Sequence, residues 1–171
     1  MPELPDVEAI RIYLMPRVVG QAFTGATLNW PRALREPSLE DFLLSLPGQK
    51  VTELARRGKY LLFRLDRADT LILHLRMTGS LVVMSSSAEL NPFTRTVFHM
   101  DNDTQLRFID PRKLGAIWLV EDERKVIGKL GPEPLEPSFT VEALASALSD
   151  RKVPIKALLC EQEVIAGIGN I

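Results

Sequence analysis

The 171-residue chain has few of the residues that build disulfides or metal centres, and it has no long apolar run. Its single cysteine, Cys160, excludes an internal disulfide and any zinc site made from several cysteines of this chain. No apolar stretch approaches the roughly 20 residues that a membrane-spanning helix needs. The first residues lack a basic segment followed by an apolar one, so we expect no secretory signal. These absences together predict a cytoplasmic protein that does not bind membranes.

The chain also lacks an excess of positive charge. Its 21 Lys and Arg residues are matched by 22 Asp and Glu residues, which gives a net charge of −1. This balance argues against nucleic-acid binding over the whole surface, but it leaves room for a local basic patch. The apolar share of 46% and the charged share of 25% are ordinary for a globular protein.

The pattern of apolar residues predicts a fold of the α+β class that is mainly β. Apolar periodicity and capping residues predict helices at 5–14, 38–46 and 141–149 and one that begins at Pro154. Between them, short alternating segments predict strands at 49–54, 59–66, 69–76, 80–84, 95–100, 105–109 and 115–120. Strands this short and closely spaced favour an antiparallel sandwich flanked by two helices, with a C-terminal helical segment.

A proline-rich stretch interrupts the chain after the last expected strand. We place a linker at 131–137, a sandwich domain at 1–130 before it, and the beginning of a helical module at 138–171 after it. The turn Ala166-Gly-Ile-Gly-Asn170 positions Asn170 to cap a further helix. Because the sequence stops one residue later, we expect that this module is incomplete.

The first residues carry a candidate nucleophile. If Met1 is removed, Pro2 has a free secondary amine that can form an imine with a sugar aldehyde carbon. An α-amine titrates near about pH 8, so part of it is unprotonated at neutral pH. The carboxylate of Glu3 follows directly. If Met1 stays in place, the Pro2 nitrogen is an amide and cannot react.

Several further motifs follow in a fixed order. They are Arg56-Arg57-Gly58-Lys59-Tyr60, His74-Leu-Arg-Met-Thr-Gly-Ser80, Asp110-Pro-Arg-Lys-Leu-Gly115, Leu130-Gly-Pro-Glu-Pro-Leu135 and the glycine turn at 166–170. With Pro2-Glu-Leu-Pro5 in front of them, the chain resembles the formamidopyrimidine-DNA glycosylase family, which also includes endonuclease VIII. Leu4 and Met77 resemble the formamidopyrimidine branch more closely.

The resemblance implies a base-excision repair enzyme that removes oxidised purines from damaged double-stranded DNA. Pro2 would form a Schiff base with the sugar and cleave the strand by β- and δ-elimination, which makes the enzyme a bifunctional glycosylase and AP lyase. Glu3 would donate a proton to the opening sugar ring, and Lys59 would hold a phosphate beside the lesion. This chemistry needs no small-molecule cofactor.

The resemblance also assigns residues that hold the DNA. A flipped base leaves a gap in the stack, and Met77, Arg112 and Leu114 match the positions that fill it. Lys156 and Asn170 match positions that contact backbone phosphates. Asp6 is a candidate for contact with the lesion.

Three departures from the family pattern weaken the expected activity. Asp6 stands where the family has glutamate, and Leu114 stands where it has phenylalanine, which removes an aromatic stacking face. The remainder of the helix–two-turn–helix module and the four-cysteine zinc finger are absent from this sequence, so we expect no metal in this chain. We expect weak or no activity from this form.

Two other functions stay open at this stage. The chain could be a relative that has lost catalysis and binds damaged or abasic DNA, or an inert fragment. The sequence leaves the roles of Arg56 and Arg57 undecided. His74 and His99 are interpreted as structural, and Cys160 as a small buried residue.

Overall fold

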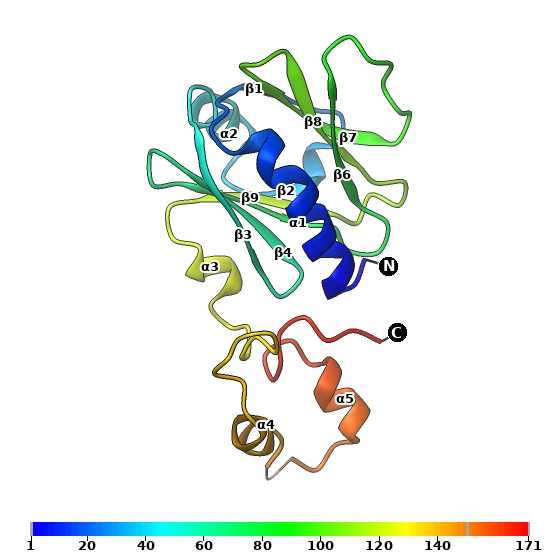
Figure 1. The fold of residues 1–171 in the computed structure, drawn as a ribbon. Helices are drawn as coiled ribbons and strands as arrows, with labels where there is room; N and C mark the ends of the chain where they lie inside the picture. Colours follow the sequence, from blue (N-terminus) through cyan, green and yellow to red (C-terminus); the bar gives the residue numbers. More distant parts are fainter. Residues whose placement is uncertain (1, 150, 171) are drawn as a thin grey trace.

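Two sheets packed face to face form most of the molecule (Figure 1). The computed structural model describes residues 2–149 and 151–170. The four-stranded sheet has the order β1 (Phe23–Leu28), β7 (Thr94–Met100), β8 (Thr104–Ile109) and β6 (Ser80–Ser85). The five-stranded sheet has the order β2 (Leu34–Glu36), β9 (Ala116–Val120), β5 (Thr70–His74), β4 (Tyr60–Leu65) and β3 (Val51–Arg57). The predicted sandwich is confirmed.

One strand pair departs from the antiparallel expectation. β2 runs parallel to β9, while the other pairs in both sheets are antiparallel. β2 follows a short 3₁₀ turn, Pro31–Ala33, rather than a hairpin. A tight hairpin would have returned the chain in the opposite direction.

Inward-facing aromatic residues fill the space between the sheets. Phe23, Phe63, Phe98 and Phe108 are fully buried. The rings of Phe23 and Phe98 are 5.8 Å apart, and Phe42 of helix α2 (Leu39–Ser45) packs edge-on against Phe98. These contacts join two strands of the four-stranded sheet to helix α2, and Phe63 of the five-stranded sheet belongs to the same apolar core.

Helix α1 (Leu4–Val18) covers the open side between the sheets, with contacts to β3, β4 and β6. Its buried side chains Val7, Leu14 and Val18 lie at helical spacing on one face. The helix is one turn longer than the sequence predicts, because Pro16 does not end it. Helix α2 begins as predicted at the cap Ser38, whose hydroxyl accepts the Asp41 N–H at 3.1 Å.

The C-terminal residues form a smaller layer below the sandwich in Figure 1. It contains α4 (Val141–Leu148) and α5 (Ile155–Cys160), and a short helix, α3 (Arg124–Ile127), precedes it. Leu158, Val164 and Ile165 form its own small core. The division of the chain into domains stays a prediction.

Two negative findings apply to the part of the chain that the structure describes. None of its helices has the length and apolarity that crossing a bilayer requires. No group of three or more His, Cys, Asp or Glu side chains within 2–149 and 151–170 is arranged to hold a metal ion.

Candidate functional site

A pocket of about 260 Å³ opens where the N-terminus meets the β3–β4 turn. Four separate segments of the chain contribute to its wall. The lining residues are Pro2, Lys59, His74, Arg76, Met77 and Gln162. Three of the sequence-predicted site residues, Pro2, Lys59 and Met77, therefore share one cavity.

Glu3 and Lys59 form an ion pair at the edge of this pocket. Both side chains are largely buried, with 15% and 12% of their surfaces exposed. The second carboxylate oxygen of Glu3, Oε1, is buried and has no hydrogen-bond partner among the described residues. A buried oxygen without a partner is costly, so this acceptor is available to a ligand that brings a donor.

The helical layer closes on Glu3 from the other side. Gly169 lies so near the carboxylate that a side chain at this position would collide with it. Gly167 lies against Leu4 and Gly58 in the same way, and a Cβ at Gly167 would collide with Leu4. The glycine turn therefore forms part of the floor of the site.

Asp6 supports the beginning of α1. Its Oδ2 accepts the backbone N–H of Glu3 at 2.8 Å, and the side chain is exposed. This bond satisfies a donor that the helix itself leaves free and fixes the backbone of Glu3. Its predicted contact with a lesion stays a prediction.

His74 lies inside the site, although the sequence suggested only a structural role. Burial, together with the smaller effect of the positive charges of Arg76 and Lys59, lowers the pKa of His74 to about 3. Its Nδ1 accepts the Arg76 N–H at 3.0 Å, and its ring packs edge-on against Tyr60. The imidazole is therefore neutral at pH 7 and presents no positive charge to the pocket.

The residues expected to fill a gap in DNA lie together on the surface. Met77 is 43% exposed on the β5–β6 loop, and Leu114 is 38% exposed on the β8–β9 loop. The guanidinium of Arg112 contacts the Met77 sulfur at 3.4 Å. The structure thus brings these two loops into contact beside the pocket that Met77 lines.

The two residues expected to contact phosphates do not line the pocket that contains Pro2. Asn170 follows the glycine turn and is exposed. Lys156 is exposed on the first turn of α5 and does not line the pocket that contains Pro2. The roles of both residues stay predictions.

Arg56 and Arg57 hold the linker and do not line the pocket. The buried carboxylate of Glu133 accepts from Arg56 Nη1 at 2.7 Å, Arg57 Nη1 at 3.0 Å and the Gly58 N–H at 2.8 Å. Burial alone would raise the pKa of Glu133, but the Gly58 N–H and both guanidinium groups outweigh it and lower the pKa. The linker residue Glu133 is therefore an ionised anchor.

Gln162 is a site residue that the sequence did not indicate. Its side-chain amide donates to the Ile168 carbonyl at 2.8 Å and accepts the Gly167 N–H at 2.9 Å. It therefore shapes the glycine turn and also lines the pocket. The one available signal was a polar residue shortly before a turn that contains two glycines.

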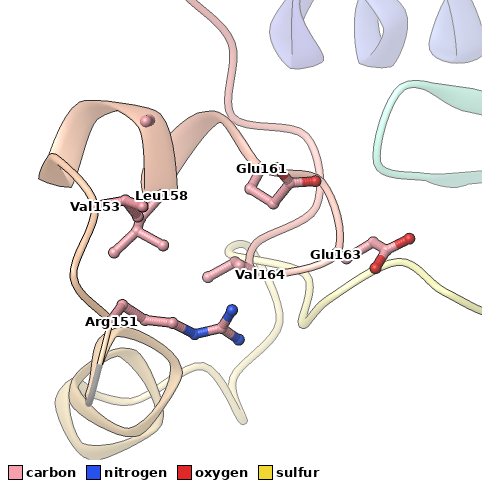
Figure 2. Close-up of a pocket in the computed structure, with 7 residues that line it drawn as sticks. Arg151, Val153, Leu158, Glu161, Glu163 and Val164 are labelled. Atoms are coloured by element: carbon pink, nitrogen blue, oxygen red, sulfur yellow. The ribbon is translucent and has the colours of Figure 1, made fainter.

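A second pocket, of about 440 Å³, lies within the helical layer (Figure 2). Val153, Leu158 and Val164 border it, and Arg151, Glu161 and Glu163 lie around them. None of the sequence-predicted site residues lines this pocket.

Comparison with known proteins shows which family the chain matches. Residues 1–117 match the formamidopyrimidine-DNA glycosylase N-terminal domain, and residues 130–171 match the helix–two-turn–helix domain of the same enzymes. The formamidopyrimidine-DNA glycosylase of Geobacillus kaustophilus is 44% identical over all of this chain and 64% of its own length. That of Protochlamydia amoebophila is 42% identical over all of this chain and 62% of its own length.

Solved structures show the same fold. The formamidopyrimidine-DNA glycosylase of Lactococcus lactis, bound non-covalently to DNA with an AP site, matches with a TM-score of 0.90 and 32% identity. The match covers 99% of this chain and 66% of that chain. The present chain spans less than two thirds of the length of the two curated relatives named above. It belongs to the formamidopyrimidine-DNA glycosylase family.

Proposed function

We propose that this chain carries the catalytic site of a base-excision repair DNA glycosylase that also cleaves the strand as an AP lyase. The observation that carries the proposal is the convergence of Pro2, the Glu3–Lys59 pair and Met77 at one pocket. The nucleophile and the proton donor that the family chemistry requires are neighbours in the sequence, but the cation that meets them comes from Lys59, 56 residues after Glu3. Their meeting is difficult to explain by packing alone.

The proposed reaction begins at the Pro2 nitrogen. Its lone pair forms a bond to C1′ of the damaged nucleotide, the bond from C1′ to the base breaks, and the base leaves with that electron pair and a proton. O4′ then leaves C1′ and takes a proton from Glu3, which leaves an iminium ion on Pro2. Loss of a proton from C2′ expels the 3′ phosphate, and a second elimination expels the 5′ phosphate.

Lys59 has two roles in this proposal. In the free protein its ammonium is paired with the Glu3 side chain. A DNA phosphate beside the lesion offers Lys59 a second anion to bind. Movement of Lys59 toward the phosphate leaves Glu3 free to take up and donate a proton.

The surface beside the pocket fits damaged double-stranded DNA. Arg76, Arg112 and Lys113 are exposed there and form no ion pair with another described residue. Lys113 also lies over the ring of Trp30, 4.4 Å from its centre. Such cations attract phosphates, and Met77 with Leu114 supplies apolar surface to fill a gap in the stack.

The family resemblance suggests the class of substrate. We propose oxidised purines as the bases removed, on bacterial DNA in the cytoplasm. The proposed steps use only an amine, a carboxylate and an ammonium group, so they require no small-molecule cofactor. These residues span less than two thirds of the length of the curated relatives, and we propose that on their own they have weak or no activity.

Borohydride trapping on a duplex with an abasic site tests the proposal. Borohydride reduces the iminium and makes the link between protein and DNA permanent. We expect an adduct from protein whose intact mass shows Pro2 as the first residue, no adduct from Pro2→Gly, and an undiminished adduct from the control Pro5→Ala. Binding without an adduct would support a damaged-DNA binding module, and the absence of both would support an inert fragment.

A further inference from the structure

The loops that carry Met77 and Arg112 share one buried carboxylate, that of Asp110. Only 1% of Asp110 is exposed. Its Oδ2 accepts the N–H groups of Leu114 and Gly115, both at 2.7 Å. Its Oδ1 accepts the Arg112 N–H at 3.2 Å and the Thr78 hydroxyl at 2.5 Å. Asp110 forms no ion pair within the described residues, so neutral donors from these two loops satisfy its charge.

Thr78 supplies the polar connection between the loops. It belongs to the β5–β6 loop with Met77, whereas the other donors belong to the β8–β9 loop. Its hydroxyl oxygen also lies 3.4 Å from the Arg112 N–H. The remaining polar link across the loops is the contact between Arg112 and the Met77 sulfur, which is exposed.

An aromatic ring supports both loops from below. Phe108 is fully buried, and a side chain added at Gly115 would collide with its ring. A Cβ at Gly79 would lie only 2.8 Å from the same ring. The ring limits how closely both loops can approach the core. Apolar contact with a ring has no preferred direction, unlike a hydrogen bond, so it does not fix the orientation of one loop relative to the other.

We infer that Thr78 is a positioning residue that joins the two loops into one rigid wedge. This inference rests on the proposed function, because it concerns how Met77, Arg112 and Leu114 enter the gap beside a flipped nucleotide. Long side chains such as Met and Arg lose much rotamer freedom when they are ordered. A short hydrogen bond to a buried carboxylate places them before DNA arrives, which removes part of that cost from binding.

Amide hydrogen exchange in the free protein tests the coupling without DNA. Thr78→Val keeps the shape of the side chain and removes the hydroxyl, so the Leu114 and Gly115 amides should exchange about tenfold faster. Thr78→Ser restores the hydroxyl and should keep their exchange within about threefold of the wild type. Thr52→Val is the matched control, because its hydroxyl donates to the Arg64 carbonyl on another strand.

A second measurement tests the role on DNA. A duplex with a tetrahydrofuran abasic analogue opposite 2-aminopurine reports insertion of the wedge as a change in fluorescence. Thr78→Val should slow this change about tenfold, Thr78→Ser should restore it, and affinity for an undamaged duplex should stay within about twofold of the wild type. A purely structural role of Thr78 would weaken binding to both duplexes alike.

The two experiments test the coupling of the loops and the wedge role separately. Unchanged exchange of the Leu114 and Gly115 amides in Thr78→Val would overturn the coupling, whatever happens on DNA. Faster exchange with an unchanged fluorescence rate would overturn the wedge role. A wild-type chain that leaves 2-aminopurine unaffected would contradict the proposed function and the wedge role together, while the exchange data would still decide the coupling.

Discussion

At the residue scale, neighbouring cations on one hairpin serve different purposes. Arg56 and Arg57 pair with Glu133, and Lys59 pairs with Glu3. The sequence indicated a cluster of cations at the beginning of a strand, but it could not assign their partners. Glu3 and Glu133 lie more than 50 residues from these cations, and Glu8, which also pairs with Arg56, lies 48 residues away, so only the tertiary fold selects the partners.

His74 shows the same limit of sequence reasoning. A histidine at the end of an apolar strand is most simply a structural residue, and this one is indeed packed against Tyr60. Its place in the pocket depends on the loop of Arg76, which turns back over the ring. The local sequence gives no sign of that approach.

The lowered pKa of His74 predicts an imidazole that stays neutral in mildly acidic solution. Its pKa is about 3 in the folded protein, against an ordinary value of 6.5. The folded chain therefore resists protonation between these two values, and stability falls as the pH decreases through this range, by at most about 1.4 kcal/mol per pH unit. The NMR signal of the His74 ring should stay constant from pH 8 to pH 4.5.

Comparison with the spectrum of His74→Gln assigns that signal. A titration midpoint near pH 6.5 for His74 would show that the ring is exposed to water and would contradict the described packing.

At the scale of elements, the sequence predicts the strands that are rich in apolar residues and misses two that are shorter or interrupted. The seven predicted strands are all present with shifted ends. β1 was missed because Gly25 interrupts the pattern of Phe23–Leu28, and β2 because it has only three residues. Both strands depend on their neighbours, β7 and β9, for their formation.

The linker was predicted as a simple connector because three prolines dominate residues 131–137. The structure shows instead that Glu133 is buried against the β3–β4 hairpin. A single glutamate between prolines is usually solvated, and its partners at 56–58 are remote in sequence. Physical reasoning from the sequence alone could not identify this anchor.

Glu133→Gln should destabilise the chain by about 3 kcal/mol, because it removes the one carboxylate that pairs with Arg57 and leaves Arg56 paired only with Glu8 among the described residues. Urea unfolding measures the effect. Glu136→Gln, at an exposed position of the same linker, is the control and should change stability by less than about 0.5 kcal/mol.

The effect of Glu133→Gln should also depend on pH. The pKa of Glu133 is lowered from 4.5 in the folded protein, so its contribution is fully present above about pH 4.5. It is lost as the pH falls through the lower folded-state pKa. Equal destabilisation by the two variants, or a difference that grows in acid, would show that the anchor is not ionised.

At the scale of the whole molecule, the candidate site exists only where the sandwich and the helical layer meet. Pro2, Glu3, Lys59 and Met77 were predicted from the family resemblance, because their spacing alone does not indicate a common pocket. The approach of Gly169 to Glu3 was not predicted. Such contacts require the packing of two layers, which local patterns do not encode.

Gly169→Ala should damage the site through this contact. The added Cβ would collide with the Glu3 carboxylate, so either the carboxylate or the glycine turn must move. We expect the yield of borohydride trapping to fall at least about tenfold, the loss that misplacement of a reacting group produces.

Gly25→Ala is the control for that experiment, because no atom lies nearer than 4.0 Å to its added Cβ. Equal trapping by Gly169→Ala and the wild type would show that the helical layer does not approach Glu3 as described.

We propose that the amine of Pro2 attacks the sugar. Tandem mass spectrometry of the borohydride-trapped complex, after digestion of protein and DNA, locates the amino acid that carries the sugar. We expect the added sugar mass on Pro2, within the N-terminal peptide. A sugar on Lys59 or on any other lysine, with Pro2 unmodified, would contradict it.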